Sequence, residues 1–375
     1  MRLTKTLFYI LNILAAQSLS AQSNSRYVNP FIGTDKSDVI TKWGSEGGTY
    51  PGAVAPWGAV QLTPETRMHE PQGYYYSDSL IYFFSCFHHM SGFPGGSAGR
   101  FYVMPVADTT AFNIGKYASR FSHNSEIAKP GYYSVYLNNN NTRVEATASD
   151  RCGVFRFTYP AGIQPFLFVS KDRSNIAMRF NTAVAEEQIV DDGKILSFKS
   201  APDAPTIIEM QLSSSSVSEE SAGRNIGMET GTDSFDKVYQ KTAVKWEEAL
   251  ALVSIDDPSE KNKTIFYTAL YHSLLVPWVI SDADGYYRGH DGKIYHSDHT
   301  QYEGFSPWDT FRTLHPLLSL LFPGRQKDMV LSLLDIYRQT GHLPTESMTG
   351  NHSVNIIVDS WRKGITADST SHIML

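Results

Sequence analysis

The spacing of apolar residues changes near residue 233, and this change restricts the fold more than any other feature of the chain. Before it, short segments such as 142–148 alternate apolar and polar side chains, which is typical of strands with one buried face. After it, apolar residues recur with the helical period of about 3.6 residues, as in 234–250. The sequence therefore predicts a β part followed by an α part.

The first part has the pattern of an antiparallel β-sandwich. The expected strands, separated by Asn, Gly and Pro, include 132–137, 142–148, 153–159 and 166–169. No long helical period interrupts them. The serine run 213–216 is expected in a late strand and the loop after it, because it has little glycine and many apolar neighbours, unlike a disordered linker.

The second part is predicted to be all-α from about Lys263. A connecting helix is expected at 234–250, and the later helices at about 265–276, after Asp309, at 326–340 and at 353–363. We therefore divide the chain into a signal peptide, a β-sandwich, a connecting helix with its linker, and a helical domain. Their expected bounds are 1–21, 22–232, 233–262 and 263–375.

Two Asp-Gly pairs lie between these helices, in the segment 282–295. They invite interpretation as a calcium loop, but their spacing does not match the twelve-residue loop, which also needs a closing Glu. Asp291-Gly292 is the pair that tight hairpin turns prefer. A β-hairpin is the favoured prediction.

The N-terminus has the form of a secretory signal. Arg2 and Lys5 precede an apolar stretch at 7–16, and the small residues ending at Ala21 suit a signal peptidase. No other segment has about 20 continuous apolar residues, so no membrane span is expected. No Cys follows the apolar run, which argues against a lipoprotein. We expect export to the periplasm or the medium.

Composition limits the partners. The net charge is −6 and no basic run exists, so nucleic acid is not an expected partner. The aromatic fraction is 13%, enough for large cores and also suited to carbohydrate surfaces. The two cysteines, Cys86 and Cys152, could pair in an oxidising compartment, although the apolar surroundings of Cys86 favour a buried free thiol.

The segment 305–316 places Trp308 beside Asp309 where a loop enters an apolar helix. An indole face can stack on the C–H patches of a sugar ring, and a carboxylate accepts hydrogen bonds from two hydroxyls. The alternative is an aromatic core residue beside an Asp that caps the helix.

Several segments together resemble glycoside hydrolase family 92, the exo-acting α-mannosidases. The similar segments are Tyr27–Thr34, Thr49–Gly58, His89–Gly92, Phe121–His123, Pro130–Val135 and Ser306–Pro316. The resemblance extends from Tyr27 to about Ile365. As a set, these segments are far more specific than any one alone.

The resemblance implies a β-sandwich joined to an (α/α)6 toroid, with the active site between the two domains. It implies an exported enzyme that removes terminal α-linked mannose, in the manner of an α-1,2-mannosidase, with calcium and with inversion at the anomeric carbon. Inversion places an acid and a base roughly 6.5–9.5 Å apart. The expected partners are mannose-containing glycans.

Five residues are the predicted substrate-binding groups: Trp308, Asp309, His89, Trp57 and Arg288. Each has a structural alternative. His89 and Trp57 can be satisfied core or loop residues, and Arg288 can pair with Asp282 or Asp284.

The catalytic acid and base have no matching segment here and are expected beyond Leu375, as are most calcium ligands. Glu303 and Glu346 are the two carboxylates to test as substitutes for the missing catalytic acid. Gly350-Asn351-His352 resembles a segment near the cleft, with a helix-capping role for Asn351 as the alternative.

A full toroid of about twelve helices needs well over roughly 200 residues, more than the stretch from Lys263 to Leu375 holds. The toroid is therefore expected to be incomplete and this chain inactive by itself. Its uncovered helix faces predict association or aggregation. Two other functions stay open: a non-catalytic glycan-binding protein, and another glycosidase with a sandwich and a toroid.

Overall fold

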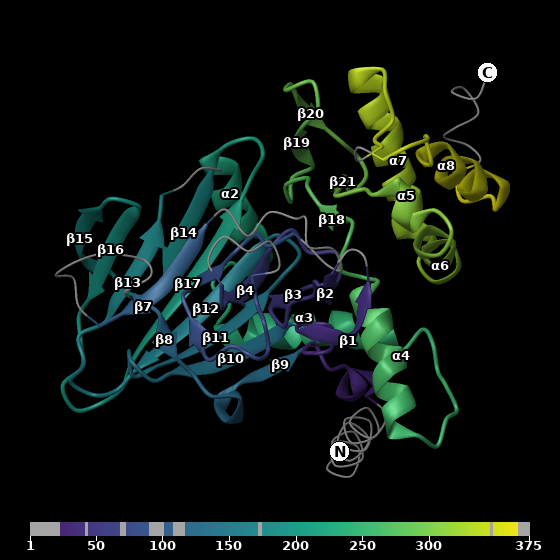
Figure 1. The fold of residues 1–375 in the computed structure, drawn as a ribbon. Coiled ribbons are helices and arrows are strands. Elements are labelled where there is room, and N and C mark those ends of the chain that lie inside the picture. Colours follow the sequence, from purple (N-terminus) through teal and green to yellow (C-terminus); the bar gives the residue numbers. More distant parts are fainter. Residues whose placement is uncertain are drawn as a thin grey trace, which may run out of the picture.

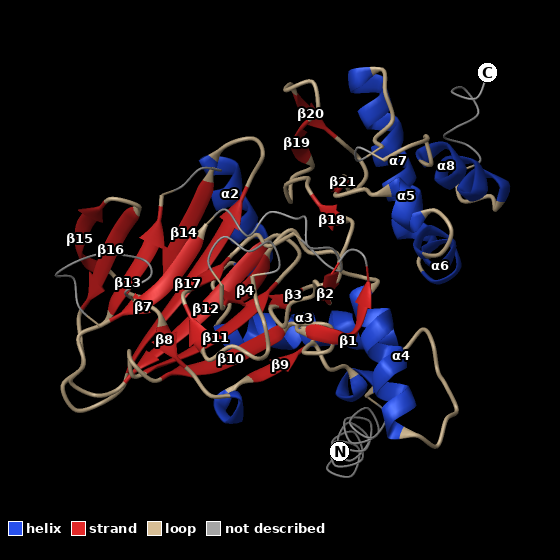
Figure 2. Cartoon of the chain, viewed as in Figure 1, coloured by secondary structure: helices blue, strands red, loops and turns tan. Residues whose placement is uncertain are grey.

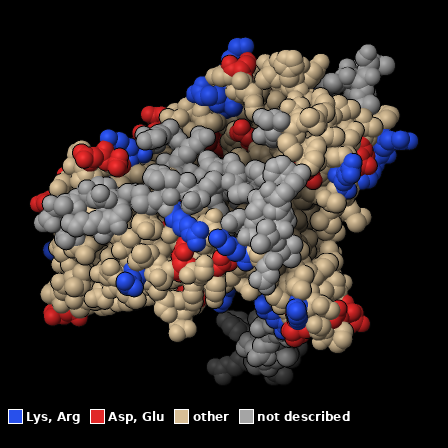
Figure 3. Space-filling view, viewed as in Figure 1, with Lys and Arg blue, Asp and Glu red and all other residues tan. Residues whose placement is uncertain are grey.

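The computed structural model describes residues 23–41, 44–67, 73–89, 101–107, 117–171, 175–345 and 348–366. The predicted signal peptide and Glu346 lie outside these ranges. Among the helices within them, none is long and apolar enough to cross a membrane. On the face shown in Figure 3, acidic and basic side chains of the described residues lie in small mixed groups.

The first part is a sandwich of two antiparallel sheets (Figures 1 and 2). The six-stranded sheet has the order β14 (Ile176–Phe180), β17 (Thr206–Ser214), β12 (Cys152–Tyr159), β11 (Thr142–Ala148), β10 (Tyr132–Leu137), β9 (Ile127–Lys129). The seven-stranded sheet has the order β15 (Val184–Val190), β16 (Gly193–Phe198), β13 (Phe166–Ser170), β7 (Tyr102–Val106), β6 (Phe83–Ser85), β4 (Gln61–Glu65), β3 (Ala53–Val54). The predicted sandwich is confirmed.

Smaller elements complete this part. Two short ribbons pair β1 (Lys36–Thr41) with β2 (Gly44–Glu46) and β5 (Leu80–Ile81) with β8 (Ser119–Arg120). Single 3-10 turns lie at Asn24–Tyr27 and His123–Ser125.

The alternation of side chains along each strand decides which residues are buried in the sandwich core. Val144 pairs with Phe157, and Ala146 with Phe155, and all four side chains are buried between the sheets. Cys86 and Cys152 are both buried and free, as the apolar context of Cys86 predicted. Burial raises the pKa of both thiols, so they pack as small apolar groups.

Helices follow the last sandwich strand. They are α2 (Glu219–Asn225), a π-helical turn (Ile226–Thr230), α3 (Phe235–Leu250), α4 (Glu260–His272), α5 (Pro307–Thr310), α6 (Leu314–Leu321), α7 (Pro323–Thr340) and α8 (Ser353–Arg362). Helix α3 is the predicted connecting helix. It starts where the Ser234 hydroxyl accepts a hydrogen bond from the Lys237 amide, and it packs against β11 and β12.

The prediction of an all-α second part is wrong in one respect. Two ribbons lie between α4 and α5: β18 (Trp278–Val279) pairs with β21 (Tyr302–Glu303), and β19 (Tyr286–Arg288) pairs with β20 (Ile294–His296). The second ribbon is the predicted hairpin, with Gly292 at φ +82° in its turn. The first joins distant two-residue strands, too short to leave a periodic pattern.

A second apolar core joins the two parts. It combines sandwich-side residues such as Tyr50, Val54 and Trp57 with side chains of α3, α4, α6, α7 and α8. The Trp246 indole N–H on α3 donates to the carbonyl of Val54 at 2.7 Å. We call the contact region between the sandwich and residues 273–305 the domain junction.

Candidate functional site

An imidazole from the sandwich and an indole from the second part meet at the domain junction. The rings of His89 and Trp278 are stacked, with 4.4 Å between centroids and 6° between planes. The His89 Nε2 atom also contacts the carbonyl oxygen of Ala59. His89 has φ +47°, which few non-glycine residues adopt. This backbone turn directs a predicted site residue across the junction.

Trp278 in turn packs against the segment that leads to Trp308. Gly304 has φ +78°, and a Cβ atom there would lie only 2.0 Å from Cζ3 of Trp278. Glycine is therefore required on both conformational and steric grounds. Gly304 follows β21 and precedes α5, so the contact sets where the next helix begins.

Trp308 and Asp309 lie in the single turn of α5. Trp308 is 45% exposed, so a large part of its ring is accessible to a ligand. The cap position is Ser306, not Asp309, and the Ser306 hydroxyl donates to the Asp309 carboxylate. The capping alternative therefore has the wrong residue, although Asp309 still helps to fix the turn.

Helix α8 brings a second ring to α5. His352 stacks on Phe311, with 4.5 Å between centroids and 12° between planes. The cap position of α8 is His352, so the capping alternative for Asn351 is also wrong. Of the two carboxylates to test as substitutes for the catalytic acid, Glu303 lies 3.7 Å from His290 and is partly exposed, and Glu346 is outside the described residues.

Trp57 occupies a different environment. It is buried and has φ +55°, and its amide and carbonyl bond to Leu274 and Val279. Its ring packs on the edge of Phe322 and lies 5.3 Å from the Arg325 guanidinium. These contacts belong to the core that joins the two parts, not to the surroundings of His89.

Arg288 fixes the hairpin instead of facing a cleft. Its guanidinium donates to the carbonyls of Ser216, Val217 and Gly292. The alternative pairing with Asp282 or Asp284 is wrong. Asp284 pairs with Arg224, while the buried Asp282 accepts hydrogen bonds from Ser215 and Asn225.

A buried polar group lies directly behind His89. The imidazole of His88 and the carboxylate of Glu65 are fully buried, 3.4 Å apart, and the Ser85 hydroxyl donates to the same carboxylate oxygen. The ring of Tyr50 lies 4.7 Å from that of His88. These contacts hold the backbone from which His89 projects.

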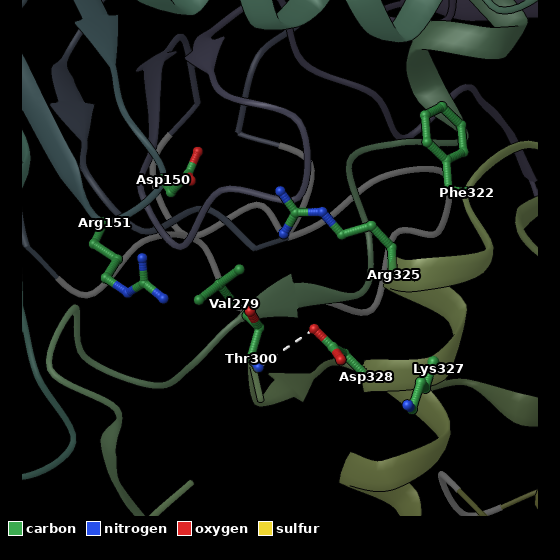
Figure 4. A pocket seen from close by; sticks show the side chains of 9 residues that line it. Asp150, Arg151, Val279, Thr300, Phe322, Arg325, Lys327 and Asp328 are labelled. Atoms are coloured by element: carbon green, nitrogen blue, oxygen red, sulfur yellow. Dashed lines mark hydrogen bonds between the residues drawn. The ribbon is translucent and has the colours of Figure 1, made fainter. Parts of the chain in front are cut away.

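A cavity of about 570 Å³ opens nearby between the sandwich and the start of α7 (Figure 4). Asp150 and Arg151 come from the turn between β11 and β12, and the other wall includes Val279, Thr300, Phe322, Gly324, Arg325, Lys327 and Asp328. The Arg151 guanidinium bonds to Glu229 and to the carbonyl of Ser281. None of the five predicted binding residues lines this cavity.

The described residues do not fit a calcium cage. Within the ranges given above, no three His, Cys, Asp or Glu side chains come together as metal ligands. Calcium prefers six to eight oxygen ligands, several of them carboxylates.

Two residues were not predicted from the sequence: Trp278 at the domain junction and Arg325 in the cavity lining. Trp278 lies in a two-residue strand, which is too short to show a periodic pattern of apolar residues. Arg325 lies in the first turn of α7, where a basic residue has no local reason to be functional. A Trp followed by Val before a Gly-rich segment was the one available signal for Trp278.

Comparisons with known proteins agree with this architecture. The N-terminal domain model of glycosyl hydrolase family 92 matches residues 27–208, and the catalytic domain model of the same family matches residues 221–374. Comparison of the sequence with curated proteins gave no match.

Solved structures of the family are similar over most of this chain. A family GH92 α-mannosidase from Bacteroides thetaiotaomicron is 26% identical, with 92% of this chain and 55% of that chain covered and a TM-score of 0.78. A GH92 inverting mannosidase from strain VPI-5482 of that species is 25% identical, with 92% and 53% covered and a TM-score of 0.79. The chain spans about half the length of these structures.

Proposed function

Because this chain belongs to glycosyl hydrolase family 92, we propose that it is part of an exported enzyme that removes terminal α-linked mannose from glycans. Two similar solved structures are described as an α-mannosidase and an inverting mannosidase, and the former has also been solved with mannoimidazole. These descriptions support α-mannoside as the substrate and inversion as the outcome. The preference for α-1,2 linkages is part of the same proposal.

The domain junction carries the proposal. His89 from the sandwich contacts Trp278, and Trp278 contacts Gly304, which leads directly into the turn that bears Trp308 and Asp309. An exposed indole beside a carboxylate can bind one face of a sugar ring and two of its hydroxyls. In this account Trp308 stacks on the sugar, Asp309 accepts from its hydroxyls, and His89 lines the sandwich side.

Two of the predicted residues have a different role in this proposal. Trp57 fixes the apolar contact between the parts. Arg288 fixes the hairpin to the segment after β17 through the carbonyls of Ser216 and Val217, and holds the hairpin turn through the carbonyl of Gly292. Neither is assigned a contact with the sugar.

No residue is assigned as the acid or the base. The calcium dependence implied by the family stays a prediction, because the described residues do not gather a ligand set. For the 375-residue chain by itself, the proposal predicts binding of α-mannosides without measurable hydrolysis. Turnover belongs to the whole protein, since this chain covers only 53–55% of the solved relatives.

The test uses two proteins: the 375-residue chain, and the chain extended by any coding sequence that follows codon 375. The first is titrated with α-1,2-mannobiose and with a matched α-glucobiose. The second is incubated with the same disaccharides while proton NMR records the first anomer released. We expect selective binding of the mannoside by the first, and β-mannose from the second.

Three results would contradict the proposal. Release of α-mannose would exclude inversion, and a preference for the glucoside would indicate another glycosidase with a sandwich and helices. Mannoside binding without turnover by both proteins would favour the non-catalytic glycan-binding alternative.

A further inference from the structure

The cavity between the sandwich and the start of α7 has a chemistry that the mannoside proposal does not use. We call it the junction cavity and define it by the lining residues given above. Val279 and Tyr302 are paired in their ribbon, and Trp278 and Glu303 form the next pair. Because neighbouring residues of a strand point to opposite faces, the junction cavity and the His89–Trp278 stack lie on opposite faces of this ribbon.

Arg325 gives the cavity its main recognition group. Its Nη1 atom donates to the Tyr302 hydroxyl at 2.7 Å, and its guanidinium packs near the Trp57 ring. Figure 4 shows the side chain extending from α7 toward the Asp150 side of the cavity. No carboxylate in the described part of the chain forms an ion pair with it. A guanidinium has five N–H donors in a planar fork, so most of its hydrogen-bonding capacity faces the cavity.

The beginning of α7 adds backbone donors to the same space. The cap position is Phe322, which offers no side-chain cap, and the first turn holds no acidic residue. Gly324 lines the cavity, and a Cβ atom built there meets nothing within 4 Å. Pro323 has no N–H and the Gln326 N–H bonds to the Phe322 carbonyl, so the backbone donors without a partner inside the helix are those of Gly324 and Arg325. They carry the partial positive charge of the helix start.

The remaining charges leave an excess of positive groups. Arg151 is compensated by Glu229 at 2.8 Å, and Asp150 by Lys245 at 2.7 Å. Arg325 and Lys327 form no ion pair within the described residues, although the Asp150 and Asp328 carboxylates both lie near enough to attract the Arg325 guanidinium. The Asp328 carboxylate also accepts a long hydrogen bond of 3.4 Å from the Thr300 amide. An additional acceptor with negative charge would complete the set.

We propose that the junction cavity binds a small oxyanion, such as phosphate, either free or as the ester group of a sugar. Arg325 bonds two oxygens through its fork, Lys327 supplies a point charge, and the first turn of α7 donates from its backbone. This proposal does not depend on mannoside binding or turnover.

The test measures phosphate binding to the 375-residue chain by calorimetry and by the thermal midpoint, with chloride replacing phosphate at equal ionic strength. Gly324→Asp places a carboxylate at the start of α7, where it should stabilise the helix but occupy the anion position. Arg325→Lys keeps the charge and removes the fork. Lys261→Ala, on the exposed side of α4, is the charge control.

We expect phosphate to raise the thermal midpoint of the wild-type chain. Gly324→Asp and Arg325→Lys should weaken phosphate binding by about tenfold or more, equivalent to about 1.4 kcal/mol, while Lys261→Ala leaves it unchanged. Glucose 6-phosphate serves as the second arm: tighter binding than inorganic phosphate identifies an ester as the ligand, and weaker binding identifies the free ion.

Two outcomes would overturn the proposal. One is wild-type protein that shows no response to phosphate beyond that of chloride. The other is Gly324→Asp and Arg325→Lys proteins that fold, by their cooperative melts, and bind phosphate as the wild type does. Equal competition by plain glucose would instead make the cavity a neutral sugar site, which also contradicts the oxyanion assignment.

Discussion

The imidazole of His89 lies face to face on the indole of Trp278, across the boundary between the sandwich and the second part of the chain. The contact is made by a residue with positive φ on one side and a two-residue strand on the other. Strained backbone that persists in a fold is held by its surroundings, here Glu65, His88 and Ala59.

Trp278→Ala should weaken the domain junction. Removing the indole takes away the stack with His89 and the contact with Gly304, and should lower the free energy of unfolding by about 3 kcal/mol. Chemical denaturation monitored by circular dichroism measures the change. Trp361→Ala is the matched control, because Trp361 is 41% exposed on α8 and should cost well under about 1 kcal/mol. Equal losses in the two variants would contradict the account.

Gly304→Ala tests the close approach of backbone and indole. Gly304 and Gly341 both have positive φ, but only at Gly304 does a Cβ atom meet a neighbour, at 2.0 Å from Trp278. Gly341→Ala should therefore cost only the conformational term, about 1 kcal/mol, and Gly304→Ala clearly more. The comparison of their denaturation midpoints is the measurement. A Gly304→Ala protein as stable as the Gly341→Ala protein would show that the contact is absent.

Stability should fall on acidification because two histidines are buried in neutral form. Burial lowers the pKa of His272 to about 4, and burial lowers the pKa of His315 to about 4 despite its hydrogen bond with Gln326. The unfolded chain binds each proton near pH 6.5, so the stabilisation is complete above that pH and is lost as the pH falls toward 4. Each histidine contributes about 3 kcal/mol to the loss.

The pH prediction is checked by urea denaturation at intervals between pH 7 and pH 4. His315→Gln should remove the contribution of His315 to the loss of stability, because an amide keeps a polar contact to Gln326 without titrating. The free energy of unfolding should then depend less on pH. His342→Gln, at an exposed position, should leave the pH dependence unchanged. A wild-type curve that is flat across this range would refute the assignment of neutral buried imidazoles.

The ion pair between Arg151 and Glu229 should be worth more than a surface pair. Both side chains are largely buried, and Arg151 also donates to the Ser281 carbonyl across the junction. Glu229→Ala should therefore cost about 3 kcal/mol, because it leaves a partly buried charge without its partner. The exposed pair of Lys363 and Asp359 on α8 is the control, with an expected cost of about 0.3–0.5 kcal/mol for Asp359→Ala.

Double-mutant cycles separate the two contributions of Arg151. If its effect comes from the pair alone, Arg151→Ala and Glu229→Ala together should cost little more than either alone. Additive losses would show that the two side chains do not act together.

Local patterns predicted the elements well, and contacts between distant segments account for the errors. The strands β10 and β11 and the helix α3 were predicted almost to the residue, because each has a complete alternation or helical stripe and a turn or cap at its end. The hairpin at Asp291-Gly292 was predicted from turn chemistry alone. The pairing of Trp278 with Glu303 could not be predicted from the sequence, because it depends on how α4 and α7 pack around it.

The candidate site was predictable only in part for the same reason. Trp308 and Asp309 stand out in sequence because an aromatic and a carboxylate adjoin a helix start. Trp57 packs against Phe322 and Arg325, and Arg288 donates to backbone carbonyls. No spacing in the sequence relates either residue to these partners. Leu320 on α6 is 77% exposed, and the incomplete toroid stays a prediction.

The most direct measurement of the central claim is saturation-transfer NMR of α-1,2-mannobiose with the wild-type chain and with Asp309→Asn and Trp308→Ala variants. Asp309→Asn keeps the size of the side chain and removes the charge that accepts two hydroxyls. The account predicts transfer to the terminal mannose in the wild type and at least about a tenfold weaker affinity in both variants. Mannobiose that binds the variants and the wild type equally, or that binds none of them, would contradict a mannoside site at Trp308 and Asp309, beside the domain junction.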